Sequence, residues 1–244
     1  MKYRIFSLFY ITIVFVPQMA AEDGSHLWLR LPTNARAQVS APYQSSTLDI
    51  AVEELQKAWQ GAPVRLVIQK DKQLKPEGFR IRCKDNTVIL SAPTEKGLLY
   101  AYHLLRLQQT TNFPLSDSKS QLTENPVYNL RILNHWDNMD RTIERGYAGQ
   151  SLWNWKELPN TLSDRYKAYA RANASIGING TVLNNVNADP KILSAEYLQK
   201  VKALADIFRP YGLRVYLSVN FASPMTLDSL NTADPLNKEV IRWW

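Results

Sequence analysis

The side chains best suited to chemistry gather in one segment of this 244-residue sequence. Residues 134–155 read NHWDNMDRTIERGYAGQSLWNW, and they combine carboxylates, amides, arginines and tryptophans. Amides and carboxylates together offer the hydrogen-bond donors and acceptors that the hydroxyl groups of a sugar require. The rings of Trp136, Trp153 and Trp155 would supply flat apolar faces for sugar rings. The segment therefore indicates a polyhydroxylated ligand.

Catalysis by these carboxylates is a separate question. Hydrolysis of a glycoside with inversion needs two carboxyl groups that face each other at about 6.5–9.5 Å. Asp137, Asp140 and Glu144 are close in sequence, but their spacing does not place two of them face to face. Arg141 and Arg145 stand beside them, so we expect Asp140 or Glu144 to form an ion pair with one of these arginines. We assign no catalytic residue.

Other chemistries lack their motifs in this sequence. It contains no GxSxG motif, no glycine-rich phosphate loop and no GxGxxG motif. The histidines at 26, 103 and 135 are far apart, without a partner at metal-ligand spacing, and Cys83 is the single cysteine. We expect His103 to be packed within a helix. His135 either bonds a neighbouring loop or contacts a ligand.

The charge of the chain is basic and scattered. There are 29 Lys and Arg residues against 22 Asp and Glu, a formal charge of +7. The densest clusters, Lys70-Asp71-Lys72 and Arg80-Ile81-Arg82, are interrupted by an acidic or an apolar residue. Proteins that bind nucleic acid concentrate their charge on one face or along one helix. We therefore interpret the excess as a solvated surface and expect no nucleic-acid partner.

Residues 1–21 are typical of a secretory signal peptide. Lys2 and Arg4 precede an apolar run from Ile5 to Val16, which is shorter than the roughly 20 residues of a membrane-spanning helix. We predict export, to the periplasm or the exterior, and no membrane contact once the peptide is cleaved. The alternative is an N-terminal helix or strand that is buried in the fold.

Residues 25–110 alternate between short strands and two helices, which predicts a compact α+β domain. The first helix carries an apolar stripe at Leu48, Val52, Leu55 and Trp59 and ends at Gly61 and Pro63. We expect strands at 26–31, 64–68, 79–83 and 87–91, the last two joined in a hairpin through Lys84-Asp85-Asn86. The second helix begins after Pro93-Thr94 and buries Leu98, Leu99, Tyr102, Leu104 and Leu105.

Residues 111–127 are polar and are interpreted as a linker. Beyond it, we expect strands at 128–133, 181–183 and 213–219 that alternate with helices at 164–176 and 194–208, the second buried along Leu198, Val201, Leu204, Ala205 and Phe208. Gly212 suits a helix C-cap. This alternation predicts a parallel sheet, whose strands have their carboxyl ends at one edge, where ligands bind. The polar residues after each strand would meet there.

Several segments resemble the α-glucuronidase family of glycoside hydrolases, which remove 4-O-methylglucuronic acid side groups from xylan-derived oligosaccharides. They read NLRILNHWDNMDRTIERGYAGQSLWNW, NASIGINGTVLNNVN, YLQKVKALADIFRPYGLRVYLSVNFASP and TADPLNKEVIRWW. In the first domain, TEKGLLYAYHLLRL resembles the N-terminal domain of the family, which is related to the accessory domain of β-hexosaminidases.

The resemblance implies an α/β fold. An N-terminal α+β domain at 25–110 would precede, at 128–244, the first three βα units of a truncated TIM (β/α)8 barrel. It implies inverting hydrolysis of α-1,2-linked glucuronic acid by an acid and a base on later strands, so this chain alone is expected to be inactive or to aggregate. The side chains expected at the sugar-binding cleft are Trp136, Asp137, Asn138, Glu144, Arg145, Asn184 and Asn185.

The resemblance also implies no metal and no organic cofactor. The expected partner is a glucuronic-acid-substituted xylo-oligosaccharide, and a homodimer of the full-length protein stays open. Two other functions remain as alternatives. A β-hexosaminidase-like glycosidase would share the two-domain plan and carry a neighbouring Asp-Glu pair after its fourth strand. A carbohydrate-binding remnant would bind sugar without turnover.

Overall fold

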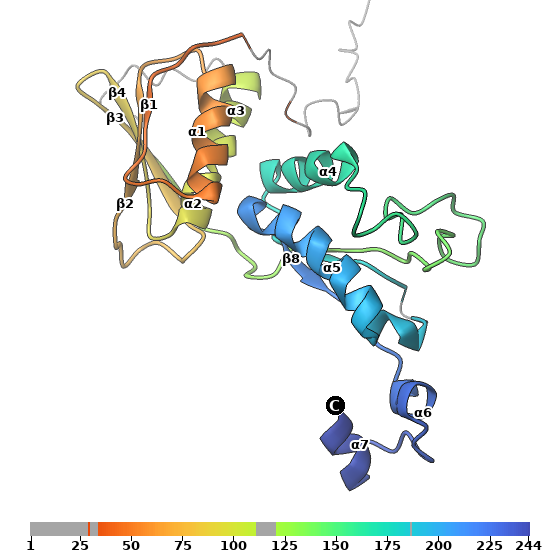
Figure 1. Cartoon of the computed structure of the whole chain (residues 1–244). Helices are drawn as coiled ribbons and strands as arrows, with labels where there is room; N and C mark the ends of the chain where they lie inside the picture. The colour runs from red at the N-terminus through yellow and green to blue at the C-terminus, as the bar shows by residue number, and fades with distance from the viewer. Residues whose placement is uncertain (1–28, 30–33, 111–120, 186) are drawn as a thin grey trace, which may run out of the picture.

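The computed structural model describes residue 29 and residues 34–110, 121–185 and 187–244. The predicted signal peptide (1–21) and the predicted strand at 26–31, except Leu29, lie outside these residues. Figure 1 shows two units, each with a sheet and helices packed beside it. Within the part of the chain that is described, no helix is long and apolar enough to cross a membrane.

The described residues of the N-terminal unit (34–110 and 121–124) form five strands and three helices. They are β1 (Val39–Ser40), α1 (Ser46–Ala58), β2 (Val64–Ile68), β3 (Phe79–Lys84), β4 (Thr87–Ala92), α2 (Glu95–Leu99), α3 (Ala101–Thr110) and β5 (Gln121–Glu124). The strand order is β1-β2-β4-β3-β5, with β3 antiparallel to both of its neighbours and the other pairs parallel. The helices lie on one side of the sheet (Figure 1).

Local sequence explains two of these elements. The Ser45 hydroxyl caps α1 by accepting a hydrogen bond from the backbone N–H of Leu48 at 3.2 Å. Leu48 and Leu55 are fully buried, so the predicted stripe faces the sheet. Between β3 and β4, Asp85 and Asn86 have φ angles of 49° and 54°, the left-handed conformation that a two-residue hairpin turn requires. The predicted helix and hairpin are confirmed.

Two predictions for this unit need correction. The second helix is interrupted at Tyr100, which separates α2 from α3, although its five predicted core residues are all buried. The predicted linker is wrong at 121–124, because these residues form β5 and pair with β3. A strand at the edge of a sheet, with one face in solvent, accommodates such polar residues. Residues 111–120 lie outside the described residues.

The C-terminal unit (residues 132–244) contains a three-stranded parallel sheet in the order β6-β7-β8, as the alternating pattern predicted. Helices α4 and α5 pack beside it (Figure 1). The elements are β6 (Ile132–Asn134), α4 (Asp164–Ser175), β7 (Gly180–Val182), η1 (Pro190–Leu193), α5 (Ala195–Phe208), η2 (Arg209–Tyr211), β8 (Arg214–Tyr216), α6 (Ser223–Asp228) and α7 (Lys238–Trp243).

The first and third strands of this unit are shorter than predicted, and the second, β7, has the predicted length but begins one residue earlier. The first begins at Ile132, whereas Tyr128, four residues earlier, is 73% exposed. On α5, Leu198 is exposed, contrary to the prediction, and Lys200 is buried in its place beside the ring of Tyr197. Gly212 does end the helical segment, with a left-handed φ of 72°. Apolar spacing thus located the elements, and packing decided their ends.

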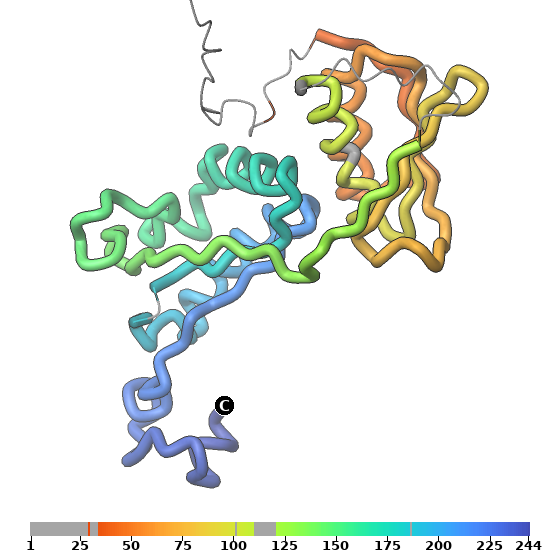
Figure 2. The backbone as a smooth tube through the Cα atoms, turned by 180° about the vertical axis from the view of Figure 1, so that it is seen from behind, coloured from red at the N-terminus to blue at the C-terminus, as the bar shows by residue number. Residues whose placement is uncertain are grey.

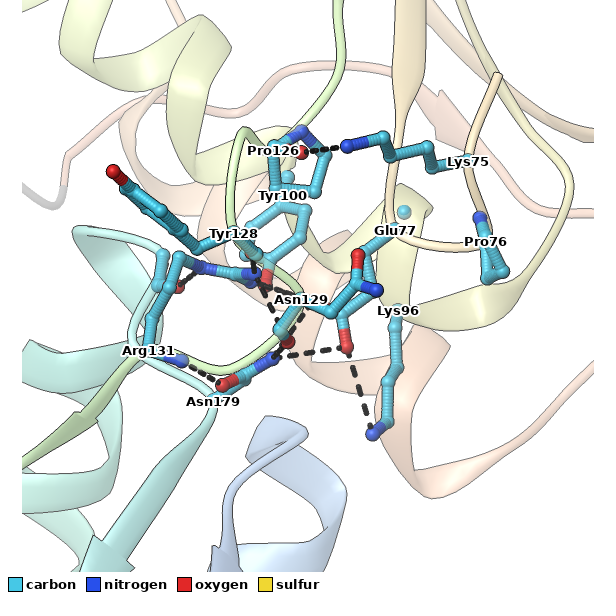
Figure 3. Close-up of polar contacts among 12 residues, drawn as sticks. Lys75, Pro76, Glu77, Lys96, Tyr100, Pro126, Tyr128, Asn129, Arg131 and Asn179 are labelled. Atoms are coloured by element: carbon cyan, nitrogen blue, oxygen red, sulfur yellow. Dashed lines mark hydrogen bonds and ion pairs between the residues drawn. The ribbon is translucent and has the colours of Figure 1, made fainter.

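A cluster of polar side chains joins the two units (Figure 3). Arg131, directly before β6, places Nη2 at 2.5 Å from Glu77 Oε2 and at 2.7 Å from the hydroxyl of Tyr100. Asn179 completes the cluster, because its Nδ2 donates to Glu77 Oε2 at 3.1 Å and its Oδ1 accepts from the backbone N–H of Arg131 at 2.8 Å. Both charged side chains are less than one-fifth exposed, at 18% and 17%.

A second ion pair ties α4 to α1. The guanidinium of Arg171 contacts Glu54 through two of its three nitrogens, with Nε at 2.5 Å from Oε1 and Nη2 at 2.7 Å from Oε2. The hydroxyl of Tyr102 donates to the same carboxylate at 3.2 Å. The hydrogen bond to Glu54 raises the pKa of Arg171. The two units are thus joined at two separate positions, by the Glu77–Arg131 pair and by the Glu54–Arg171 pair, and two attachments constrain their relative orientation.

Burial and pairing act in opposite directions on Glu77. Burial raises the pKa of its carboxyl group, whereas the hydrogen bond and the positive charge of Arg131 lower it, and the pKa lies below its usual 4.5. The pKa in the folded state is therefore lower than in the unfolded state. Consequently the carboxylate stabilises the fold above about pH 4.5, and this stability is lost as the pH falls through the folded-state pKa.

We expect Glu77→Gln to lower the free energy of unfolding at pH 7 by about 1–3 kcal/mol, because it removes one partner of a mostly buried ion pair. Urea unfolding measures this loss, and the difference from the unaltered chain should shrink below pH 4.5. Glu53→Gln is the matched control, since its ion pair with Lys57 is 58% and 54% exposed. An equal loss in both variants would contradict the larger stabilising role assigned to the Glu77–Arg131 pair.

Candidate functional site

The segment between β6 and α4, residues 135–163, forms a long loop that starts at the carboxyl end of β6. Figure 2 shows it on the far side of the C-terminal unit from the N-terminal unit. Two isolated antiparallel bridges, Asp137 with Ile143 and Thr142 with Gln150, fold it back on itself. We call this segment the β6–α4 loop. It holds five of the seven side chains expected at the cleft.

Asp137 anchors the interior of the loop. Its side chain is buried, and Oδ2 accepts a hydrogen bond from the hydroxyl of Ser151 at 2.5 Å. The same hydroxyl accepts from the backbone N–H of Trp153 at 3.0 Å. His135 lies on the other side, with Nδ1 at 3.8 Å from Asp137 Oδ1. The carboxylate thus holds the start of the loop against residue 151, near the middle of the loop.

His135 extends this network to the neighbouring elements. Its Nε2 is 2.8 Å from the hydroxyl of Tyr169 on α4, which is 2.9 Å from the hydroxyl of Thr181 on β7. Burial lowers the pKa of His135, and the negative charge of Asp137 partly offsets this effect. Burial also raises the pKa of Tyr169 to about 12. Of the two roles considered for His135, these contacts correspond to bonding between elements.

Asn185, which follows β7, connects its strand end to the loop. Its backbone N–H donates to the carbonyl of Asp137 at 2.8 Å. Its side-chain Nδ2 lies 3.4 Å from the carbonyl of Trp136 and 3.3 Å from Asn138 Oδ1. Asn138 in turn donates to the carbonyl of Glu144 at 2.8 Å. Five of the expected residues are therefore joined directly by hydrogen bonds.

The backbone of Glu144 is in the left-handed region, with a φ of 56°. This conformation costs a residue other than glycine about 1–2 kcal/mol. Hydrogen bonds hold it from both sides, because the Glu144 N–H donates to the carbonyl of Trp136 at 2.8 Å and its own carbonyl accepts from Asn138. Such conformations persist where the surroundings enforce them, and they concentrate at ligand sites.

Among the seven residues expected at the cleft, some side chains are exposed to solvent and others are buried and hydrogen-bonded. Trp136 is 42% exposed, and Arg145 lies in solvent at the loop surface. Asn184 is 2% exposed, and its amide is used in a strand-to-strand connection. Its Nδ2 donates to the carbonyl of Ser218 and its Oδ1 accepts from the N–H of the same residue, both at 2.9 Å. The side chain of Asn184 therefore connects the end of β7 to the end of β8.

The loop differs from the sequence-based expectations in two ways. Trp153 and Trp155 are fully buried and cannot offer a ring to a sugar. Trp153 packs against the rings of Tyr166, Tyr169 and Phe208, because a loop of this length needs an apolar core of its own.

The expected ion pair of Asp140 or Glu144 with Arg141 or Arg145 is also wrong, since no such contact exists among these described residues. Asp140 instead accepts from Thr142, at 2.9 Å from the backbone N–H and 2.7 Å from the hydroxyl.

Sequence reasoning missed the hydroxyl groups of the network, those of Ser151, Tyr169 and Thr181. Tyr169 lies within the predicted helix at 164–176, and a tyrosine hydroxyl that becomes buried needs a hydrogen-bond partner. That requirement is the signal that the sequence offered. Among the described residues, no group of three or more His, Cys, Asp or Glu side chains could hold a metal ion.

A parallel sheet with a polar, tightly bonded loop at its carboxyl edge is the arrangement of α/β enzymes that bind polar ligands there. The sequence profile described as the glycosyl hydrolase family 67 middle domain matches residues 111–244. The chain belongs to this family of glycoside hydrolases. This match favours the first of the functions considered above over the β-hexosaminidase-like alternative.

Two curated relatives agree with this assignment. A protein of Aspergillus clavatus named "Probable alpha-glucuronidase A" is 46% identical over 176 residues, which are 70% of this chain and 20% of that protein. The protein of the same name from Aspergillus terreus is 35% identical over 265 residues, with 92% and 31% covered. The chain therefore spans about a fifth to a third of these relatives.

A GH138 enzyme that targets pectin rhamnogalacturonan II superposes with a TM-score of 0.53 at 14% identity, over 85% of this chain and 28% of that one. This likeness concerns the fold alone.

We expect Asp137→Asn to lower the pKa of His135 further, because the substitution removes the negative charge that offsets burial. Titration of the imidazole signals by NMR measures the change. His103 is the control. Burial also lowers its pKa, but it lies in the N-terminal unit and not beside Asp137, so its pKa should not change. A His135 pKa that stayed constant or rose would show that the carboxylate does not act on it.

Proposed function

We propose that this chain is the N-terminal part of an α-glucuronidase. The enzyme would hydrolyse α-1,2-linked (4-O-methyl)glucuronic acid from xylan-derived oligosaccharides with inversion. The observation that carries the proposal is the set of Trp136, Asn138, Glu144 and Asn185, hydrogen-bonded at the carboxyl ends of β6 and β7 in a member of glycosyl hydrolase family 67. The names of the relatives support the same activity.

In this proposal the chain binds and orients the sugar. The exposed ring of Trp136 would stack on a pyranose face, and the exposed guanidinium of Arg145 would pair with the uronate carboxylate. The carboxylate of Glu144 and the remaining acceptor position of Asn138 Oδ1 would bond the ring hydroxyls, because both amide hydrogens of Asn138 are already donated within the loop. Asp137, His135 and Asn184 would keep the loop and strand ends in place through their existing contacts.

We also propose that further strands continue the sheet of the C-terminal unit. We interpret β6, β7 and β8 as the first strands of a (β/α)8 barrel, since their parallel order and flanking helices are those of such a barrel. Leu133, Val219 and Phe221 are exposed on or after these strands and would be covered by further strands. A general acid and a base on those later strands would protonate the glycosidic oxygen and activate water.

Export completes the proposal. The basic residues and short apolar run of residues 1–21 favour a signal peptide that delivers the enzyme to its polysaccharide substrate outside the cytoplasm.

Calorimetric titration with glucuronic acid and with aldouronic acids tests the binding role. We expect Trp136→Ala to weaken binding by about three- to tenfold, the effect of one lost stacking contact. Trp244→Ala is the control, because Trp244 is 49% exposed but lies at the end of α7. Equal affinities for Trp136→Ala and the unaltered chain would overturn the assignment of this loop.

Turnover tests the division of roles within the barrel. We expect the 244-residue chain to release no glucuronic acid from aldouronic acids, because no acid and base pair is assigned to it. Release of glucuronic acid by a soluble monomer of this chain would contradict that division. Binding without turnover in the full-length protein would instead support the carbohydrate-binding alternative.

A further inference from the structure

The sheet of the N-terminal unit has one face without helices. Val64, Leu66, Ile81, Val88 and Leu90 point to the helices and belong to the core. Because side chains alternate along a strand, the residues between them point to the opposite face. Figure 1 shows α1, α2 and α3 on the same side of the sheet, so no described helix covers that opposite face. We call it the outer face.

Three cations on the outer face have no carboxylate partner among the residues that the structure describes. Arg65, Arg82 and Lys84 are exposed, and none of them forms an ion pair with another described residue. Arg80, on the same face of the same strand as Arg82, is different. It pairs with Asp71 at 2.8 Å and donates to the side chains of Gln73 and Thr123 at 2.9 and 3.1 Å.

The strand register brings these cations close together. Arg65 of β2 and Arg82 of β3 both lie opposite Ile89 of β4, so the two arginines are two strand spacings, about 10 Å, apart. Lys84 lies two residues beyond Arg82 and opposite Thr87, on the same face. The sequence analysis interpreted the charge of the chain as scattered, but folding concentrates this part of it.

A hollow lies beside these residues. Its volume is about 420 Å³, and its lining includes Arg65, Lys84 and Asp85 together with the hydroxyl groups of Ser40 and Thr87. Ile89 also lines it but is buried, at 3% exposed, so polar side chains offer most of the contacts. The two cations, beside one carboxylate, and the two hydroxyl groups can bond the carboxylate and the hydroxyl groups of a uronic acid.

The like charges of these exposed side chains repel one another across about 10 Å, and the repulsion is stronger at low ionic strength. An anionic partner would relieve this repulsion, and a regularly charged polymer would do so for several cations at once. We propose that the outer face is a docking surface for an acidic polysaccharide that bears uronic acid groups. The choice of a polysaccharide over another polyanion rests on the proposed function, whereas the charge and shape of the face do not depend on it.

The test is retardation of the full 244-residue chain in gels that contain glucuronoxylan. We expect the unaltered chain to be retarded at about 50 mM salt and released at about 500 mM, because exposed ionic contacts are screened. Arg65→Glu with Arg82→Glu should weaken binding by about tenfold, and Arg65→Gln with Arg82→Gln by less. The glutamine variant removes the charge without adding a new one, so it keeps the test valid if the glutamate variant misfolds.

The control is Lys191→Glu with Lys238→Glu, which changes the net charge equally at two exposed positions of the C-terminal unit. It should bind within about twofold of the unaltered chain. The arginine variants alter the outer face alone, so their effect on retardation separates this surface from the cleft even if the proposed function fails. An equal loss in the control would overturn the proposal, as would equal binding to neutral xylan or to double-stranded DNA.

Discussion

The amide of Asn185 is the contact on which the candidate site depends. It joins the carboxyl end of β7 to Trp136 and Asn138, which follow β6, and through Asn138 it reaches Glu144. Parallel pairing alone brings two strand ends to one edge, but it does not decide how a loop of nearly thirty residues returns across them. The buried amide of Asn185, with two donor hydrogens and an acceptor oxygen, fixes the path of the loop, because each of these groups left unpaired would cost about 1–3 kcal/mol.

A second constraint acts at the other end of the C-terminal unit. Glu77 with Arg131 and Glu54 with Arg171 fasten that unit to the N-terminal one, through partly buried pairs that also bond Tyr100 and Tyr102. These contacts therefore attach the unit that carries the strand ends to the unit that carries the outer face. If both surfaces bind carbohydrate as proposed, these ion pairs help to set the distance between them.

The sequence predicted the fold better than it predicted the site. Apolar spacing located α1, α4 and α5, and the alternation of strand and helix predicted the parallel order of β6, β7 and β8. It also predicted that Trp136, Asn138 and Asn185 would lie together, because parallel strands end at one edge. Composition could not tell an exposed indole from a buried one, so Trp153 and Trp155 were assigned to the ligand although they form the core of the loop.

The ion pairs between the units escaped prediction because their partners are 54 and 117 positions apart. That separation matters for how the chain is made. On the ribosome the residues of α1 and of the segment before β3 emerge first, and Glu54 and Glu77 then have no cationic partner from the other unit. The N-terminal unit reaches its full stability only after Arg131, Arg171 and Asn179 have been synthesised, so its folding is completed by a part of the chain translated much later.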